Sequence, residues 1–133
     1  MLDYPVKILM AFAMTFEEDG DSFHQWLLEN GYPELAALSD TIKGSRNALE
    51  WLMKNKYFHL AAFDAAIDNN KNAKEWLSKY NYPILIVLAN AVNNDESAIK
   101  WLLNNELEAY IIIAQKIRES LEKRAFDPHK LFF

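Results

Sequence analysis

Apolar residues recur along the chain with a period of 25 residues. A tryptophan occupies four positions at this spacing, and a leucine follows it each time: Trp26, Leu27, Trp51, Leu52, Trp76, Leu77, Trp101 and Leu102. Four further columns repeat in register, three residues before the tryptophan and six, nine and sixteen residues after it. Their members are Phe23, Ala48, Ala73 and Ala98; Tyr32, Tyr57, Tyr82 and Leu107; Leu35, Leu60, Leu85 and Tyr110; and Ile42, Ile67, Val92 and Ile117. A fixed period of this length is typical of stacked-repeat proteins.

The pattern within each repeat predicts two short helices. The first covers segments such as "YPELAALSDTIK" and "YPILIVLANAVN", in which Pro33 and Pro83 stand at a first-turn position that needs no N–H donor. The second carries the A-x-x-W-L pattern, whose apolar residues form a single narrow stripe. Ser45, Asn70 and Asp95 occupy one column just before this helix, and all three are good N-cap residues.

We therefore expect an all-α fold of stacked helical-hairpin repeats, similar to an α-solenoid. The expected helices lie near residues 5–17, 22–30, 33–43, 46–55, 58–68, 71–80, 83–93, 96–105 and 107–125. The last is longer and has one apolar face, as a C-terminal capping helix should. Residues 1–126 form a single repeat domain in this interpretation, and residues 127–133 form a tail.

The Trp-Leu pairs are predicted to be the core of the repeats. Helices this short are marginal alone, because nucleation costs most of the free energy that propagation returns. Stacked units can close a core if each tryptophan fills the gap between its partner helix and the next repeat. On this interpretation, truncation of such a tryptophan to alanine costs about 3–5 kcal/mol.

This pattern resembles α-solenoids built of helical hairpins, over nearly the whole chain. The segment "AIKWLLNNE" is similar to the second helix of an ankyrin repeat. The period is shorter than in ankyrin, HEAT or tetratricopeptide repeats, and neither the T-P-L-H start nor a β-turn finger is present. The resemblance is thus to a class of folds. It implies binding to other proteins along a stacked-helix surface.

Composition and charge narrow the function classes. The formal net charge is −5, with −7 in residues 1–115 and +2 in residues 116–130. A general nucleic-acid binder needs a basic surface, so we expect no nucleic-acid partner. The chain has no cysteine, which removes thiolate metal sites and a cysteine nucleophile. No stretch approaches the ~18 apolar residues of a membrane span, and the N-terminus lacks the features of a signal peptide. We expect a cytoplasmic protein with no membrane partner.

The candidates for chemistry are few. His24, His59 and His129 lie in different elements without ligand spacing, which favours surface histidines. Asp64 and Asp68 are four residues apart and share one helix face. Asn90 and Asn93 are expected on one side of this pair, and Asp40 and Lys43 on the other. Two carboxylates without a third ligand usually form a solvated face, so we expect no metal, cofactor or catalytic residue.

Two apolar features are candidate interaction surfaces. The expected first helix has only Lys7 and Thr15 as polar residues, so Ile8, Met10, Phe12 and Met14 need a cover. A homodimer through this helix is one solution. The other is the C-terminal tail, in which Leu131, Phe132 and Phe133 are either docked on the domain or available to a partner.

The function expected from these observations is a non-catalytic protein–protein interaction module. The alternative is a hydrolase or metal-dependent enzyme that uses the acidic face around Asp64 and Asp68. A helical-repeat nucleic-acid binder is a third hypothesis, opposed by the net charge. A concave carboxylate cluster with a perturbed pKa would favour the enzyme, and a basic groove would favour the nucleic-acid binder.

Overall fold

The computed structural model describes residues 3–125, and all regular structure in this range is α-helical. The helices are α1 (Val6–Met14), α2 (Asp21–Glu29), α3 (Pro33–Ile42), α4 (Arg46–Lys54), α5 (Phe58–Ile67), α6 (Lys71–Lys79), α7 (Pro83–Val92), α8 (Glu96–Asn104) and α9 (Glu108–Ala125). The all-α class and the helical hairpins are confirmed. None of the described helices is both long enough and apolar enough to cross a membrane.

Three of the second helices have a polar N-cap side chain at their start, as expected. The Ser45 hydroxyl accepts a hydrogen bond from the Ala48 N–H at 3.1 Å, and the Asn70 side chain accepts one from the Ala73 N–H at 3.0 Å. The Asp95 carboxylate accepts from the Ser97 N–H at 2.9 Å. Each cap satisfies a backbone donor that has no partner inside its helix, which fixes where α4, α6 and α8 begin.

The second helices also end alike, in a left-handed residue five positions after the tryptophan. These residues are Gly31, Lys56, Asn81 and Glu106, with φ between 58° and 86°. The N–H of the next residue then donates to the carbonyl of the repeat leucine at 2.8–2.9 Å in all four repeats. This is the hydrogen bond of a Schellman motif, which stops the helix and turns the chain into the next one.

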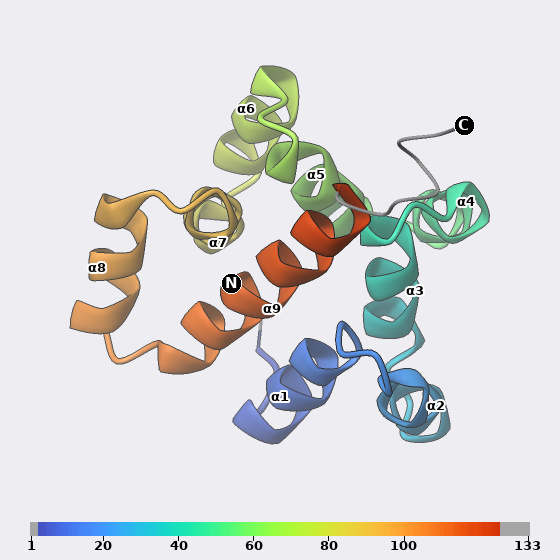
Figure 1. Cartoon of the computed structure of the whole chain (residues 1–133). Coiled ribbons are helices and arrows are strands. Elements are labelled where there is room, and N and C mark those ends of the chain that lie inside the picture. Colours follow the sequence, from blue (N-terminus) through green and yellow to red (C-terminus); the bar gives the residue numbers. More distant parts are fainter. Residues whose placement is uncertain (1–2, 126–133) are drawn as a thin grey trace.

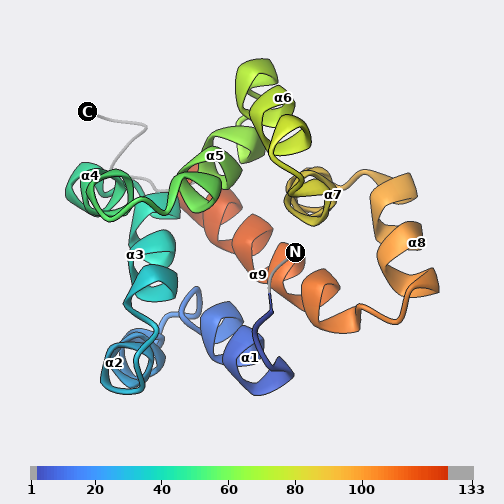
Figure 2. The same cartoon turned by 180° about the vertical axis from the view of Figure 1, so that it is seen from behind.

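The helices form an inner and an outer layer (Figure 1). The outer helices α2, α4, α6 and α8 lie at the periphery, and each packs against the two inner helices that flank it in sequence. The inner helices pack in the order α1, α3, α5 and α7. Helix α9 runs across the middle, as the view from behind also shows (Figure 2).

Helix α9 closes this arrangement. It packs against α7 and α8 as a capping helix should, but it also packs extensively against α1. Lys116 and Lys123 form ion pairs with Glu17 and Glu18 in the loop after α1. The guanidinium of Arg124 donates to the Ile42 carbonyl at the end of α3 at 2.8 Å. The last helix therefore joins both ends of the repeat array.

The core contains the leucines of the Trp-Leu pairs but not the tryptophans. Leu27, Leu52, Leu77 and Leu102 are all fully buried. Trp26, Trp51 and Trp76 are only partly buried and pack against the core from its edge, and Trp101 is 46% exposed. The expectation that the tryptophans fill the core is corrected accordingly. Successive helical residues point about 100° apart. The outer helices α2, α4 and α6 each bury a single residue, the leucine, so the tryptophan before it lies at the edge of the core.

The apolar first helix is covered within the chain. Ile8 and Phe12 are buried at 6% and 3% exposure, because α9 and α3 pack on α1. They are therefore not an exposed interaction surface, and the reason for expecting a dimer through them is removed. Met10 and Met14 stay partly exposed. The predictions for His129, Leu131, Phe132 and Phe133 lie outside the described residues.

Candidate functional site

The outer face carries grooves built from the same repeat columns. One lies between α2 and α4 over α3, and the next lies between α4 and α6 over α5. Eight columns line both: His24, Leu28, Pro33, Ala36, Ala37, Asn47, Ala48 and Trp51 in the first, and Leu49, Met53, Phe58, Ala61, Ala62, Asn72, Ala73 and Trp76 in the second. Alanines of the inner helix form the floor. A half-buried tryptophan of the following repeat forms one wall.

A third groove between α1 and α2 follows the same plan. Met10 and Met14 line it together with Phe23 and Trp26, and the Lys7 ammonium lies 5.6 Å from the centroid of the Trp26 ring. Two of the expected interaction residues, Met10 and Met14, therefore lie together in a groove of about 440 Å³. This groove is a surface feature of the repeat, not an uncovered end of the array.

The groove between α4 and α6 gathers several exposed apolar side chains, and we call it the α4–α6 groove. Its volume is about 770 Å³, against about 420 Å³ for the groove between α2 and α4. Three of its lining side chains are large, apolar and exposed: Met53 at 47%, Phe58 at 42% and Tyr80 at 51%. Such a concentration of exposed apolar surface marks an interaction site more often than a free surface.

Aromatic contacts fix one wall of the α4–α6 groove. The Trp76 ring lies 4.6 Å from the Tyr80 ring and stacks on the Tyr82 ring at 6.2 Å, centroid to centroid. Tyr82 stacks in turn on His59 at 4.8 Å. Burial lowers the pKa of the His59 imidazole, and the Glu34 carboxylate opposes this shift. The stack holds Trp76 in a defined orientation at the edge of the core.

The charges near the α4–α6 groove are mostly positive. Its two wall helices and their ends carry the exposed lysines Lys54, Lys56, Lys71 and Lys79, against the exposed acids Glu50 and Glu75. The Lys79 ammonium lies 5.4 Å from the centroid of the Tyr80 ring, directly at the groove. Lys71 lies 4.0 Å from Glu75. Residues 1–45 carry two lysines against eight acids, so the basic balance here contrasts with that of the first part of the chain.

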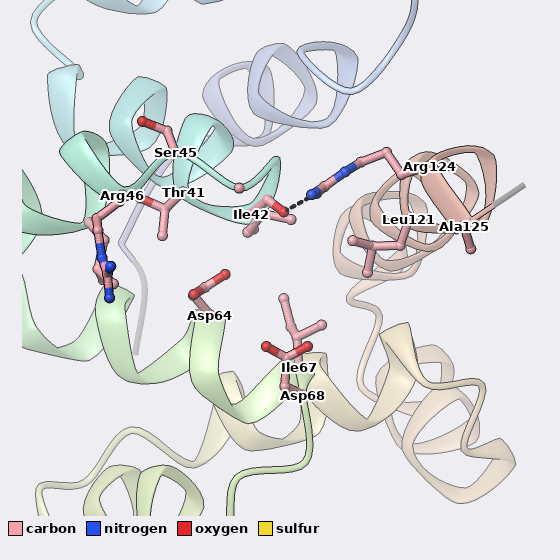
Figure 3. A pocket seen from close by; sticks show the side chains of 12 residues that line it. Thr41, Ile42, Ser45, Arg46, Asp64, Ile67, Asp68, Leu121, Arg124 and Ala125 are labelled. Atoms are coloured by element: carbon pink, nitrogen blue, oxygen red, sulfur yellow. Dashed lines mark hydrogen bonds between the residues drawn. The ribbon is translucent and has the colours of Figure 1, made fainter. Parts of the chain in front are cut away.

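A second site lies on the inner side, between the end of α3, helix α5 and the end of α9 (Figure 3). This cavity has a volume of about 500 Å³. Asp64 of α5 and Asp68, the residue that caps the end of α5, line it together with Arg46 and Arg124. The two aspartates therefore share one cavity, as the enzyme hypothesis requires. In Figure 3 the Asp64 carboxylate points into the space between α5 and the end of α3.

Asp64 is not part of a solvated pair, which corrects the sequence-based expectation. Burial raises the pKa of its carboxyl to about 6, repulsion from Asp68 adds to this shift, and Arg124 opposes it. Among residues 3–125, none forms a hydrogen bond or an ion pair with the Asp64 side chain. A partly buried carboxyl that titrates near neutral pH is a candidate for proton transfer.

The repeat register contains a signal for Asp64 that the sequence analysis missed. Thirteen residues after the tryptophan, the other repeats have Ser39, Ala89 and Ala114. These three small residues are at most 3% exposed. Only the repeat of Trp51 places a carboxyl group at this core position. A comparison of burial-prone columns, rather than of helix spacing alone, would have separated Asp64 from Asp68.

The other polar residues expected near the aspartates have separate roles. Asn93 donates to the Ile67 carbonyl at 2.9 Å, at the end of α5. Asn90 accepts from Lys74 at 3.0 Å, and Lys43 donates to the Thr15 carbonyl at 2.5 Å. Asp40 lies 2.9 Å from the Nε2 atom of His24, on the outer face. No group of three or more metal-binding side chains occurs within the described part of the chain.

Comparisons with known proteins add no function to this geometry. Family models, curated protein sequences and solved structures were compared with the chain, and none of them matches it.

Proposed function

We propose that this chain is a protein–protein interaction module that binds its partner on the outer face, with the α4–α6 groove as the main contact. The observation that carries the proposal is the group of exposed apolar side chains, Met53, Phe58 and Tyr80, in one open groove of about 770 Å³. In a monomer these apolar side chains are exposed to water, which is unfavourable. A partner that covers them removes this surface from water and gains binding free energy.

The repeat geometry supports the same proposal. Equivalent columns build grooves on successive repeats, so a partner can contact more than one of them along the outer face. Each groove has an aromatic wall and a floor of alanines, which permits close approach of a partner segment. Large aromatic side chains of this kind dominate the binding energy of many interfaces.

The test compares partner capture by the wild type and by a groove variant. Phe58→Ala with Tyr80→Ala removes exposed apolar surface, and neither residue belongs to the core cluster. Ile112→Ala, which truncates an exposed apolar residue of α9, is the matched control. Affinity purification from the native host, followed by mass spectrometry, should recover a protein with the wild type and the control but not with the double variant. Equal recovery with all three chains would contradict the groove as the binding site.

The inner cavity supports a second candidate function, an enzyme of the hydrolase class. The specific observation is the raised pKa of Asp64 at the wall of a cavity of about 500 Å³. A carboxyl with a pKa of about 6 can give a proton to a leaving group, or take one from a water molecule, near neutral pH. A screen of ester, amide and phosphate substrates tests this function. An activity that Asp64→Asn abolishes and Asp68→Asn retains would support it.

A further inference from the structure

We infer that the partner segment bound in the α4–α6 groove is an amphipathic α-helix with acidic residues beside its apolar face. This inference rests on the proposed function, because it names the class of partner for the same groove. Three features of the groove carry it: its dimensions, the position of its exposed apolar side chains, and the charge at its edges.

The dimensions fit a helix. The walls α4 and α6 are nine residues each, which corresponds to about 13 Å of helix, and both pack against α5. Apolar side chains at positions i, i+4 and i+7 of a partner helix span about 10 Å along its axis. Ala61 and Ala62 form the floor, so the backbone of an incoming helix can approach closely. A helix lying between two helices is a common mode of peptide recognition.

The exposed apolar side chains stand on all three sides of the groove. Met53 belongs to the α4 wall, Phe58 to the start of α5, and Tyr80 to the end of the α6 wall. An apolar stripe on one side of a partner helix would contact all three at once. An extended strand would instead need free backbone donors and acceptors at an edge, which two helical walls do not offer.

Charge selects an acidic helix. Four exposed lysines and two exposed acids stand on α4, α6 and their ends, and the Lys79 ammonium is close to the Tyr80 ring. One of the acids, Glu75, already has Lys71 as its neighbour at 4.0 Å. A partner with glutamates or aspartates beside its apolar stripe gains attraction from Lys54, Lys56 and Lys79. A basic helix is repelled by the same groups.

The first experiment identifies the chemistry of groove binders directly. A phage-displayed library of single α-helices, with randomised surface positions, is selected for binding to the full chain. Clones are then tested on Phe58→Ala and on the matched control Ile112→Ala. Clones that lose binding only to Phe58→Ala are groove binders. We expect their residues beside the apolar stripe to be enriched in acids relative to the unselected library.

The outcomes separate this inference from the proposed function. Groove binders whose flanking residues are neutral or basic overturn the acidic partner and leave the proposed function standing. If no selected clone depends on Phe58, the groove is not a protein-binding site, and both proposals fail.

A second experiment measures the contribution of the lysines. The strongest acidic groove binder is labelled, and its dissociation constant is measured by fluorescence anisotropy on Lys54→Glu with Lys79→Glu. We expect at least a tenfold weakening at about 50 mM salt and a smaller one at about 300 mM, because salt screens exposed charges. Lys100→Glu on α8 is the control and should change affinity less than twofold. A change below twofold for the double variant overturns the role of charge.

Discussion

Adjacent residues of a helix point in different directions, and this separates the roles of the repeated tryptophan and leucine. The leucine points between the inner helices and is fully buried in every repeat. The tryptophan points toward the outer face, where it forms the wall of a groove and contacts the tyrosines of its own repeat. The 25-residue repeat therefore encodes both a core position and a surface position. The two positions should differ strongly in their effect on stability.

Truncation of the leucine should cost far more than truncation of the tryptophan in the last repeat. Leu102→Ala leaves a cavity in the core and should lower the free energy of unfolding by about 2–5 kcal/mol. Trp101→Ala removes a side chain that is 46% exposed and should cost about 1 kcal/mol. Urea unfolding followed by circular dichroism measures both. A larger loss for Trp101→Ala than for Leu102→Ala would place the tryptophan in the core after all.

Asp64 should make the chain less stable as pH rises. Its pKa is about 6 in the folded state and about 3.8 in the unfolded state, so the folded state holds the proton more tightly. The protonated form is present in both states below pH ~4, and the burial cost appears as pH rises through about 6. Asp64→Asn should therefore stabilise the chain by about 1–3 kcal/mol at pH ~7.5 and have little effect at pH ~4.

Asp68→Asn is the control for this titration. Repulsion from Asp68 contributes to the raised pKa of Asp64, so its removal should lower that pKa and move the loss of stability to lower pH. The pKa of Asp64 can be followed by carboxyl ¹³C chemical shifts in both chains. A pKa near 4 in the wild type would show that water reaches Asp64 freely and would remove the second candidate function.

At the scale of the helices, the start and end of each helix depend on local signals that can be recognised in the sequence. N-cap residues, proline at the first turn and the 25-residue period were sufficient to predict the helices close to their observed bounds, because each signal acts within a few residues. The left-handed residue after each second helix was not predicted, because only two of the four, Gly31 and Asn81, have residue types that favour this conformation. Lys56 and Glu106 adopt the same conformation because the Schellman hydrogen bond holds them there.

Replacement of Glu106 by glycine should stabilise the end of α8. Glu106 has a φ of 58°, where a side chain costs roughly 1 kcal/mol and glycine costs nothing. The greater freedom of glycine in the unfolded state offsets part of this gain, so Glu106→Gly should add about 0.5 kcal/mol to the free energy of unfolding. Lys100→Gly, inside the same helix, should instead cost about 1 kcal/mol. Chemical denaturation of both variants tests the sign, and destabilisation by Glu106→Gly would contradict this account of the turn.

At the scale of the whole molecule, the contact between α1 and α9 joins residues about 100 positions apart. No local signal encodes such a contact. The sequence indicated that α1 needed a cover, but the covers that it suggested, a second copy and the tail, did not include α9. The same limit applies to both candidate sites. The α4–α6 groove needs three helices placed together, and the cavity at Asp64 needs α9 to reach the end of α3.

Because α9 contacts both ends of the repeat array, local unfolding should differ from that of an open stack of repeats. In an open stack of repeats, a terminal unit has one neighbour and exchanges its amides first. Here α1 has α2, α3 and α9 as neighbours, and α9 has α1, α7 and α8. The amides in the middle of α1 should therefore exchange with free energies within about 1 kcal/mol of those in α5, which lies in the middle of the chain.

A substitution in α1 should then weaken α9 as well. Phe12→Ala removes a side chain that is 3% exposed in the core, whereas Val6→Ala truncates a residue of the same helix that is 64% exposed. Hydrogen exchange monitored by NMR should show that Phe12→Ala lowers the protection of α1 and α9 together, relative to α5, while Val6→Ala changes neither. If α1 loses protection and α9 keeps it, the two ends open independently, and the molecule behaves as an open stack despite their contact. If α1 and α9 lose protection together, the repeats unfold as one closed unit. The contact between α1 and α9 then helps to fix the positions of the outer helices that form the groove walls.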